Sequence, residues 1–137
     1  MRFLIVVKAT RASEAGVMPP EPLIIEMAAY HEQLVRAGVL LDAAGLRPSA
    51  KGWRIRHAGQ RRTVIEGPFA DARDLIAGYT LIQAQSKAEA LEWSRRFPNP
   101  AFDGREGEIE VRQLVELEAF GFGAAVGRWR DLGVESG

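Results

Sequence analysis

The chain has 137 residues, of which 47% are hydrophobic and 26% charged, which fits one domain and leaves little room for a second. Eighteen basic residues balance eighteen acidic ones, so no overall charge favours nucleic acid or an anionic membrane as a partner. The absence of cysteine excludes disulfides, zinc–thiolate sites and a cysteine nucleophile. No apolar run approaches the roughly 20 residues of a membrane-spanning helix, and the N-terminus lacks the length of a signal peptide. We therefore expect a cytoplasmic protein with no membrane partner.

The N-terminal part of the chain predicts a buried strand, a loop and a helix. Residues 2–8 (RFLIVVK) are apolar at consecutive positions, which indicates a strand buried on both faces. Residues 9–22 contain Gly16 and three prolines and are typical of a mobile loop. A helix then continues to a C-terminal stop at Gly38, because mostly apolar side chains recur at helical spacing. This stripe consists of Leu23, Ile24, Met27, His31, Leu34 and Val35.

The middle of the chain predicts two core strands separated by an inserted hairpin. Residues 39–45 (VLLDAAG) form the first of these strands and carry Asp42. Residues 53–57 (WRIRH) and 61–66 (RRTVIE) flank a three-residue turn and are typical of short surface strands in a hairpin. Residues 78–84 (GYTLIQA) are apolar on both faces and predict a second central strand.

A second helix and a final strand follow. Ser86 and Glu89 form an S-x-x-E capping box at the start of the helix, which ends at Pro98. Residues 108–114 (EIEVRQL) alternate strictly between the two faces of a strand. The strand therefore has one apolar face and one charged face.

Without the hairpin, the order strand, helix, strand, strand, helix, strand is the βαββαβ pattern of an α+β ferredoxin-like sandwich. We assign residues 1–120 to this single domain and residues 121–137, which have weak periodicity, to a C-terminal tail. Two right-handed crossovers place both helices on one face of the sheet. The opposite face is uncovered although the central strands are apolar there too. This favours a homodimer in which two sheets pack face to face.

One segment carries a family likeness. The run EGPFADARDLIAGYTLIQAQSKAEALEWSRRFPNP (residues 66–100), followed by GEIEVRQL, resembles the YCII-related proteins of the DGPF branch, with Glu66 in place of the aspartate of the name-giving motif. The likeness extends to about Phe120. It implies a subunit that dimerises as a dimeric α/β barrel, with a cleft between sheet and helices. Some related proteins act on small aromatic or organic substrates, and relatives of this branch often occur in association with sigma factors.

His31 is the leading candidate for acid–base chemistry, and Asp42 is a second candidate catalytic residue. A His–Asp pair has been proposed as the site in another YCII branch, but its histidine position falls here on Met27, one turn before His31. The aspartate has Asp103 as its nearest match, so strict transfer fails. A histidine on this stripe can act as acid or base near neutral pH, or can simply bond to a backbone carbonyl at the boundary of the core. Both alternatives stay open.

Charged residues on the edge strands form a second group of candidates. Glu110 and Arg112 are expected on the sheet face opposite the helices, the face on which Asp42 is also expected. The two edge strands lie three strand spacings apart, about 14 Å, so only a ligand or a partner subunit brings these residues together. The structural alternative is a charged rim or an ion pair between subunits.

The segment after the hairpin supplies the remaining candidates. Gly67 is expected in a turn with positive φ. The residues that we expect at the mouth of the cleft are Glu66, Phe69, Asp71 and Arg73. The alternative is a rigid corner that joins the hairpin to the core and binds nothing.

Other ligand classes are disfavoured. The two histidines have no neighbouring ligands at metal-binding spacing, and no phosphate-binding glycine loop is present, so we expect neither a metal nor a cofactor. Basic residues gather around Trp53 in the hairpin, but the neutral total charge disfavours nucleic acid as a partner.

Two functions of different class remain. One is an enzyme that acts on a small molecule without a metal, as a lyase, isomerase or hydrolase. The other is a noncatalytic dimer that binds a metabolite or a protein, linked to sigma-factor regulation.

Overall fold

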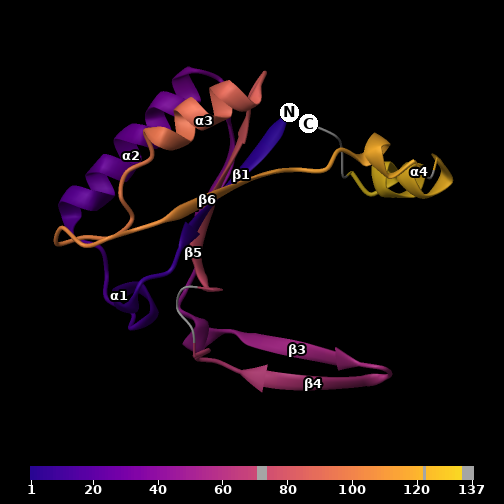
Figure 1. The fold of residues 1–137 in the computed structure, drawn as a ribbon, viewed down its shortest axis with the longest axis horizontal. Helices are drawn as coiled ribbons and strands as arrows, with labels where there is room; N and C mark the ends of the chain where they lie inside the picture. Colours follow the sequence, from indigo (N-terminus) through magenta and orange to yellow (C-terminus); the bar gives the residue numbers. More distant parts are fainter. Residues whose placement is uncertain (71–73, 122, 134–137) are drawn as a thin grey trace.

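The predicted ferredoxin-like α+β fold is present in the structure. This is a computed structural model, and it describes residues 1–70, 74–121 and 123–133. The main sheet has four antiparallel strands in the order β2-β5-β1-β6. Its strands are β1 (Arg2–Lys8), β2 (Leu40–Gly45), β5 (Ile76–Gln83) and β6 (Ile109–Gln113). The helices α2 (Glu21–Arg36) and α3 (Lys87–Arg95) lie together on one face of the sheet (Figure 1).

The core lies between this sheet and the two helices. Its buried members from the sheet and from α2 are Phe3, Ile5, Tyr30, Leu34 and Ile82. Removing these large apolar side chains from water is the main force that holds the layers together. Ile109 and Val111 of β6 pack against the edge of this cluster, which confirms the alternation predicted for the last strand.

The buried face of α2 is rotated from the predicted stripe. Tyr30 and Leu34 are buried, whereas Val35 is 61% exposed and Ile24 is 50% exposed. Residues 30 and 34 are one helical turn apart and define the centre of the buried face, so the neighbouring position 35 turns about 100° away from it. Including Val35 in the core stripe was therefore wrong.

The start of the second helix matches the prediction in part. The Ser86 hydroxyl accepts a hydrogen bond from the Glu89 N–H at 3.1 Å, which confirms Ser86 as the N-cap. The Glu89 carboxylate accepts from the N–H of Gln85 at 2.8 Å, one residue before the cap, so the capping box is not fully closed.

The loop predicted at residues 9–22 contains a short helix, α1 (Arg11–Glu14). Thr10 and Ser13 cap it reciprocally: the Ser13 N–H donates to the Thr10 hydroxyl at 3.1 Å, and the Thr10 N–H donates to the Ser13 hydroxyl at 2.8 Å. The prediction of an unstructured loop was wrong at this point, because one capped turn is too short to show helical periodicity in the sequence.

The inserted hairpin is present and stands apart from the main sheet. Strands β3 (Trp53–Ala58) and β4 (Arg61–Glu66) pair only with each other in an antiparallel ribbon, and Figure 1 shows the ribbon projecting away from the sheet. Trp53 is 63% exposed, as expected for surface strands.

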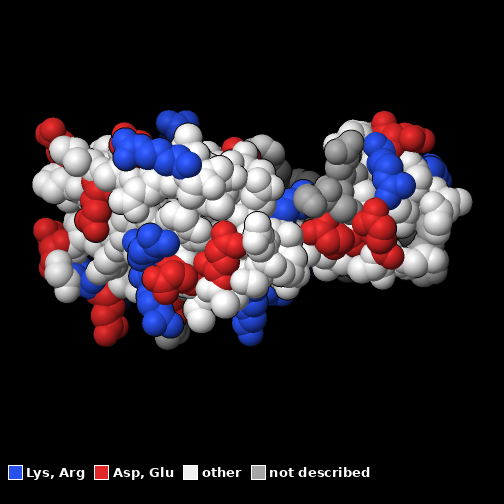
Figure 2. Space-filling view, turned by 90° about the horizontal axis from the view of Figure 1, so that it is seen from above, with Lys and Arg blue, Asp and Glu red and all other residues white. Residues whose placement is uncertain are grey.

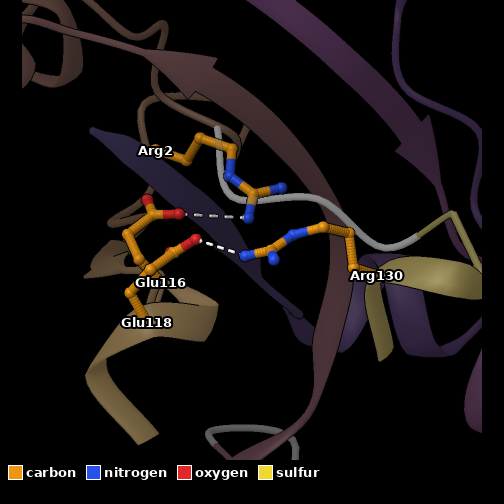
Figure 3. Close-up of polar contacts among 4 residues, drawn as sticks. All are labelled: Arg2, Glu116, Glu118 and Arg130. Carbon is orange, nitrogen blue, oxygen red and sulfur yellow. Dashed lines mark hydrogen bonds and ion pairs between the residues drawn. The ribbon is translucent and has the colours of Figure 1, made fainter. Parts of the chain in front are cut away.

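The C-terminal segment has more structure than its weak periodicity predicts. It contains the turn η3 (Leu117–Phe120) and the helix α4 (Gly123–Asp131), and α4 lies apart from the sheet (Figure 1). Two ion pairs fix this segment (Figure 3). Arg130 of α4 contacts Glu118 of η3 at 2.6 Å, and Arg2 of β1 contacts Glu116, which precedes η3, at 3.5 Å.

Charge is distributed evenly over the face shown in Figure 2. Basic and acidic side chains alternate there, and no broad patch of one sign forms, as a neutral chain leads one to expect. Among the described helices, none is both long and apolar enough to cross a membrane.

The face of the sheet opposite α2 and α3 carries an apolar centre. Leu4 of β1 lies beside Leu81 of β5, and Val6 lies beside Tyr79 in the next row. All four side chains are only half-buried. Figure 1 shows both helices on the other side of the sheet, whereas the hairpin and α4 extend on this side. The predicted uncovered apolar face is therefore present.

Tyr30 gives a test of how the helix layer is held. It is 4% exposed, its hydroxyl donates to the Trp93 carbonyl at 2.7 Å, and burial raises its pKa to about 12. The folded pKa lies above the unfolded value of about 10, so this stabilisation is complete below pH 10 and is lost as the pH rises towards 12. We expect Tyr30→Phe to lower the free energy of unfolding at pH 7 by about 1 kcal/mol.

Urea melts of both proteins from pH 8 to 12 provide the measurement. The difference between wild type and variant is expected to narrow above pH 10, because only the wild type loses this contribution. A difference that stays constant over that range contradicts the role assigned to the buried hydroxyl.

Candidate functional site

A cavity of about 870 Å³ opens between the helix-facing side of the sheet and α2. Ligand sites in proteins commonly have volumes of roughly 300–1,000 Å³. Its floor comes from the adjacent ends of β2 and β5, and part of its wall comes from Met27 and His31 of α2. Phe97 and Phe102, which follow α3, also line it. The predicted cleft between sheet and helices is therefore present.

Small residues explain why the core stops where the cavity starts. On the helix-facing side, Ile5, Thr80 and Ala43 lie in one row across β1, β5 and β2. The next row towards the cavity pairs Gly78 with Gly45. Glycines cannot fill the space that Ile82 fills at the other end of β5, so α2 and the sheet remain separated here. The runs DAAG and IAG in the sequence are the signal for this space, and sequence reasoning missed it.

His31 is held in a defined orientation at the wall of the cavity. Its Nδ1 lies 2.8 Å from the Met27 carbonyl oxygen, one turn earlier on α2. A carbonyl only accepts, so Nδ1 carries the proton. Nε2 lies 2.8 Å from the Thr80 hydroxyl, and in the neutral ring it accepts from that hydroxyl. The two bonds select one tautomer and place Nε2 beside the only buried hydroxyl of the cavity floor among the described residues.

Aromatic rings restrict His31 further. Its ring contacts Tyr30 and Phe97 edge-to-face, with centroid distances of 5.4 and 6.0 Å. Thr80 is 2% exposed, whereas His31 is only half-buried. The sequence predicted a half-buried His31 on the α2 stripe, but its partner Thr80 was missed, because a single threonine in an apolar strand carries no pattern of its own.

Asp42 lies on the other face of the sheet. Its carboxylate accepts a hydrogen bond from the Tyr79 hydroxyl at 2.9 Å, and this bond raises the pKa of Tyr79. Asp42 does not line the cavity, so the structure does not bring it to His31. The alternation of β5 is the reason, because Tyr79 and Thr80 point to opposite faces.

Glu110 and Arg112 lie on the uncovered face, as predicted. They contact each other at 3.3 Å, and Lys8 contacts Glu110 at 3.4 Å. The Arg112 hydrogen bond and then the Lys8 charge lower the pKa of Glu110. Neither Glu110 nor Arg112 lines the cavity, so any ligand role for them requires a partner on the uncovered face.

The residues expected at the mouth of the cleft lie outside the cavity or outside the described chain. Glu66 pairs with Trp53 at the base of the hairpin, and the Phe69 ring lies under the Arg54 guanidinium at 3.8 Å. Neither lines the cavity. Asp71 and Arg73 lie outside the described residues.

The described part of the chain contains no group of three or more His, Cys, Asp or Glu side chains that could hold a metal ion. His57, the second histidine, is exposed on the hairpin, where the Arg62 Nε donates to its Nδ1 at 3.2 Å.

Comparison with known proteins shows which family the chain belongs to. The family model for the YCII-related domain matches residues 1–118. The chain belongs to the YCII-related family. An uncharacterised protein of Rhizobium meliloti (strain 1021) is 32% identical to this YCII-related protein over 95 residues, which cover 69% of this chain and 75% of that one.

A solved structure whose backbone is partly similar is that of the 5-chloro-2-hydroxyhydroquinone dehydrochlorinase of Burkholderia phenoliruptrix, in complex with 2,5-dihydroxybenzoquinone. It has 15% identity and a TM-score of 0.43, with 85% of this chain and 95% of that chain covered. The DGPF branch, which the motif at residues 66–69 suggested, fits the family match and stays a prediction.

Gly67 of this motif is required for a different reason from the one predicted. It is absent from the described residues that have positive φ, so the expected left-handed turn was wrong. A Cβ at this position would overlap the backbone carbonyl of Ser49. Close approach of two backbone segments, from the hairpin exit and from the turn before β3, explains the glycine.

We expect Gly67→Ala to lower the free energy of unfolding by about 1–3 kcal/mol, because the backbone at Ser49 must move to admit the methyl group. Gly52→Ala is the matched control in the same corner, since its Cβ would meet the Ser49 oxygen at an ordinary 3.7 Å. Urea melts of the two variants compare them directly. Equal midpoints for both contradict the close-approach explanation.

Proposed function

We propose that this YCII-related protein binds a small organic molecule in the cavity and that His31 exchanges a proton with it. The observation that carries the proposal is the geometry of His31: a cavity-lining imidazole whose tautomer is set by the Met27 carbonyl and whose Nε2 is directed at Thr80 on the cavity floor. A histidine with a fixed tautomer and one nitrogen at the wall of a ligand-sized cavity is suited to general acid–base catalysis.

The chemistry needs only groups that line the cavity. A bound substrate with an acidic C–H or O–H replaces the Thr80 hydroxyl as the donor to Nε2 and transfers its proton there. The ring becomes an imidazolium, and its Nδ1–H continues to donate to the Met27 carbonyl, which stabilises the charge. Returning the proton to another atom of the substrate completes an isomerisation, and returning it to a departing group completes an elimination. Proton abstraction from water at the same nitrogen supports a hydrolase.

A noncatalytic module that binds a metabolite or a protein, including one linked to sigma-factor regulation, is the second candidate. One observation favours it: both nitrogens of His31 already have partners within the protein, as a purely structural histidine requires. Activity measurements separate the two functions, because only the enzyme needs Nε2 to change its protonation state.

The test begins with a thermal-shift screen of organic metabolites, since a ligand at 100 times its Kd adds about 2.7 kcal/mol of stability. Compounds that bind are then assayed for turnover. We expect His31→Gln to keep the fold and lower kcat by about 10²- to 10⁴-fold. The variant is also expected to have a pH–rate profile of different shape, because the acid or base has been removed.

His57→Gln is the control, because it removes the other histidine from an exposed site on the hairpin. It is expected to leave rate and profile unchanged. Equal rates and profiles for wild type and His31→Gln remove His31 as the acid or base and favour the noncatalytic function.

We further propose that the uncovered face of the sheet is covered by a second copy of the chain. Its centre is apolar at Leu4 and Leu81, and charged residues border it at both edges, Asp42 on β2 and Arg112 on β6. A face of this kind is self-complementary under two-fold symmetry, because each edge meets the opposite edge of its partner. Such packing of two sheets is the dimeric α/β barrel that the family likeness implies.

We expect sedimentation equilibrium at micromolar concentration to show a dimer, and Leu81→Glu to shift the protein to a folded monomer, because the variant places a charge in the apolar centre of the interface. Leu91→Glu is the matched control, since Leu91 is 52% exposed on α3, in the helix layer. A monomeric wild type, or equal association of the two variants, contradicts the proposed dimer.

A further inference from the structure

The cavity is lined by cations and by no described acid. Lys8, Arg47 and Lys51 all line it, together with apolar and small residues. Lys8 is neutralised by Glu110 at 3.4 Å. Arg47 and Lys51 have no ion pair with an acid of the described chain, so their charges are available to a ligand. The neutral total charge of the protein hides this local excess.

The segment that carries Arg47 and Lys51 is fixed at both ends. Its start is held by the N–H of Leu46, which donates to the Ala77 carbonyl of β5 at 2.8 Å. Its end is held by the carbonyl of Gly52, which accepts from the N–H of Gly67 at 3.0 Å. A loop held in this way presents its cations with little ordering cost on binding.

Glu14 fixes the middle of the same segment and is occupied in doing so. Its carboxylate accepts from the Ser49 hydroxyl at 2.6 Å and from the Ser49 N–H at 3.1 Å. The Phe69 N–H in turn donates to the Ser49 hydroxyl at 3.0 Å. Glu14 does not line the cavity, so the acid bonded to the loop orients it from outside the cavity.

The cationic segment follows the strand that pairs with the hydrogen-bond partner of His31. Thr80, the partner of His31, pairs with Ala43 of β2, and Arg47 follows four residues later along the chain. At about 3.3 Å per residue the Cα atoms of Ala43 and Arg47 are separated by roughly 13 Å or less. Arg47 and His31 border the same cavity.

We infer that the ligand of this cavity is an organic acid, with an apolar body against the aromatic and aliphatic wall and a carboxylate bound by Arg47 and Lys51. The guanidinium group suits a planar carboxylate through paired N–H donors. The inference rests on the proposed function for the role of His31 at the other end of the ligand, but the binding of the acid does not depend on catalysis.

The experiment compares matched pairs of ligands. Benzoate, 4-hydroxybenzoate and phenylacetate are titrated against the full-length protein by NMR or calorimetry, each beside its uncharged carboxamide. We expect the acids to bind with Kd values in the range of about 1 mM or below and the carboxamides to bind at least about tenfold more weakly. Arg47→Gln and Lys51→Gln are each expected to weaken the acids about tenfold and to leave the carboxamides unchanged.

Arg56→Gln is the matched control, because it removes a cation from the exposed hairpin outside the cavity. It is expected to leave all affinities unchanged. Three outcomes overturn the inference: no acid binds at about 10 mM, the carboxamides bind as tightly as the acids, or Arg56→Gln weakens binding as much as Arg47→Gln. Acids that bind through Arg47 but are insensitive to His31→Gln in turnover overturn the proposed function alone.

Discussion

The hydrogen bond between His31 and Thr80 joins the helix layer to the sheet at the point where the packed core ends. On one side of this bond, Ile5, Ile82 and Leu34 fill the space between α2 and the sheet completely. On the other side, the helix-facing positions are small and a cavity of about 870 Å³ remains. Leaving either partner buried without its bond costs about 1–3 kcal/mol. The pair therefore holds the wall of the cavity in place before a ligand binds.

The strand alternation of β5 directs successive polar side chains to opposite faces of the sheet. Thr80 points to the cavity with its neighbour Ala43 across the sheet, while Tyr79 points to the uncovered face and bonds to Asp42. The two candidate catalytic residues, His31 and Asp42, are therefore not brought together within one subunit, although they lie on elements that follow each other in the chain. His31 instead has a hydroxyl partner and a carbonyl partner.

The fold was predictable because its signals are long-range and periodic. The apolar runs of β1 and β5 indicate central strands that are apolar on both faces, and the alternation of β6 indicates an edge strand. The crossover rule then leaves one arrangement of the helices. The site was less predictable, because it depends on contacts between single residues. Thr80, Arg47 and Lys51 carry no local pattern, and only the strand register brings them to the cavity that His31 lines.

Gly67 is a second case in which a contact between distant residues could not be predicted from the sequence. Its glycine was recognised as a special backbone position, but the reason is the nearby Ser49 carbonyl, which lies on a segment 18 residues earlier in the chain. The Ser49 hydroxyl also donates to the Glu14 carboxylate and accepts from the Phe69 N–H, so the motif at residues 66–69 and the loop that carries Arg47 and Lys51 share one anchoring residue. The corner after the hairpin is thus coupled to the charged end of the cavity through backbone contacts, even though its own side chains do not line it. This arrangement gives the motif a structural role that serves the site without touching a ligand.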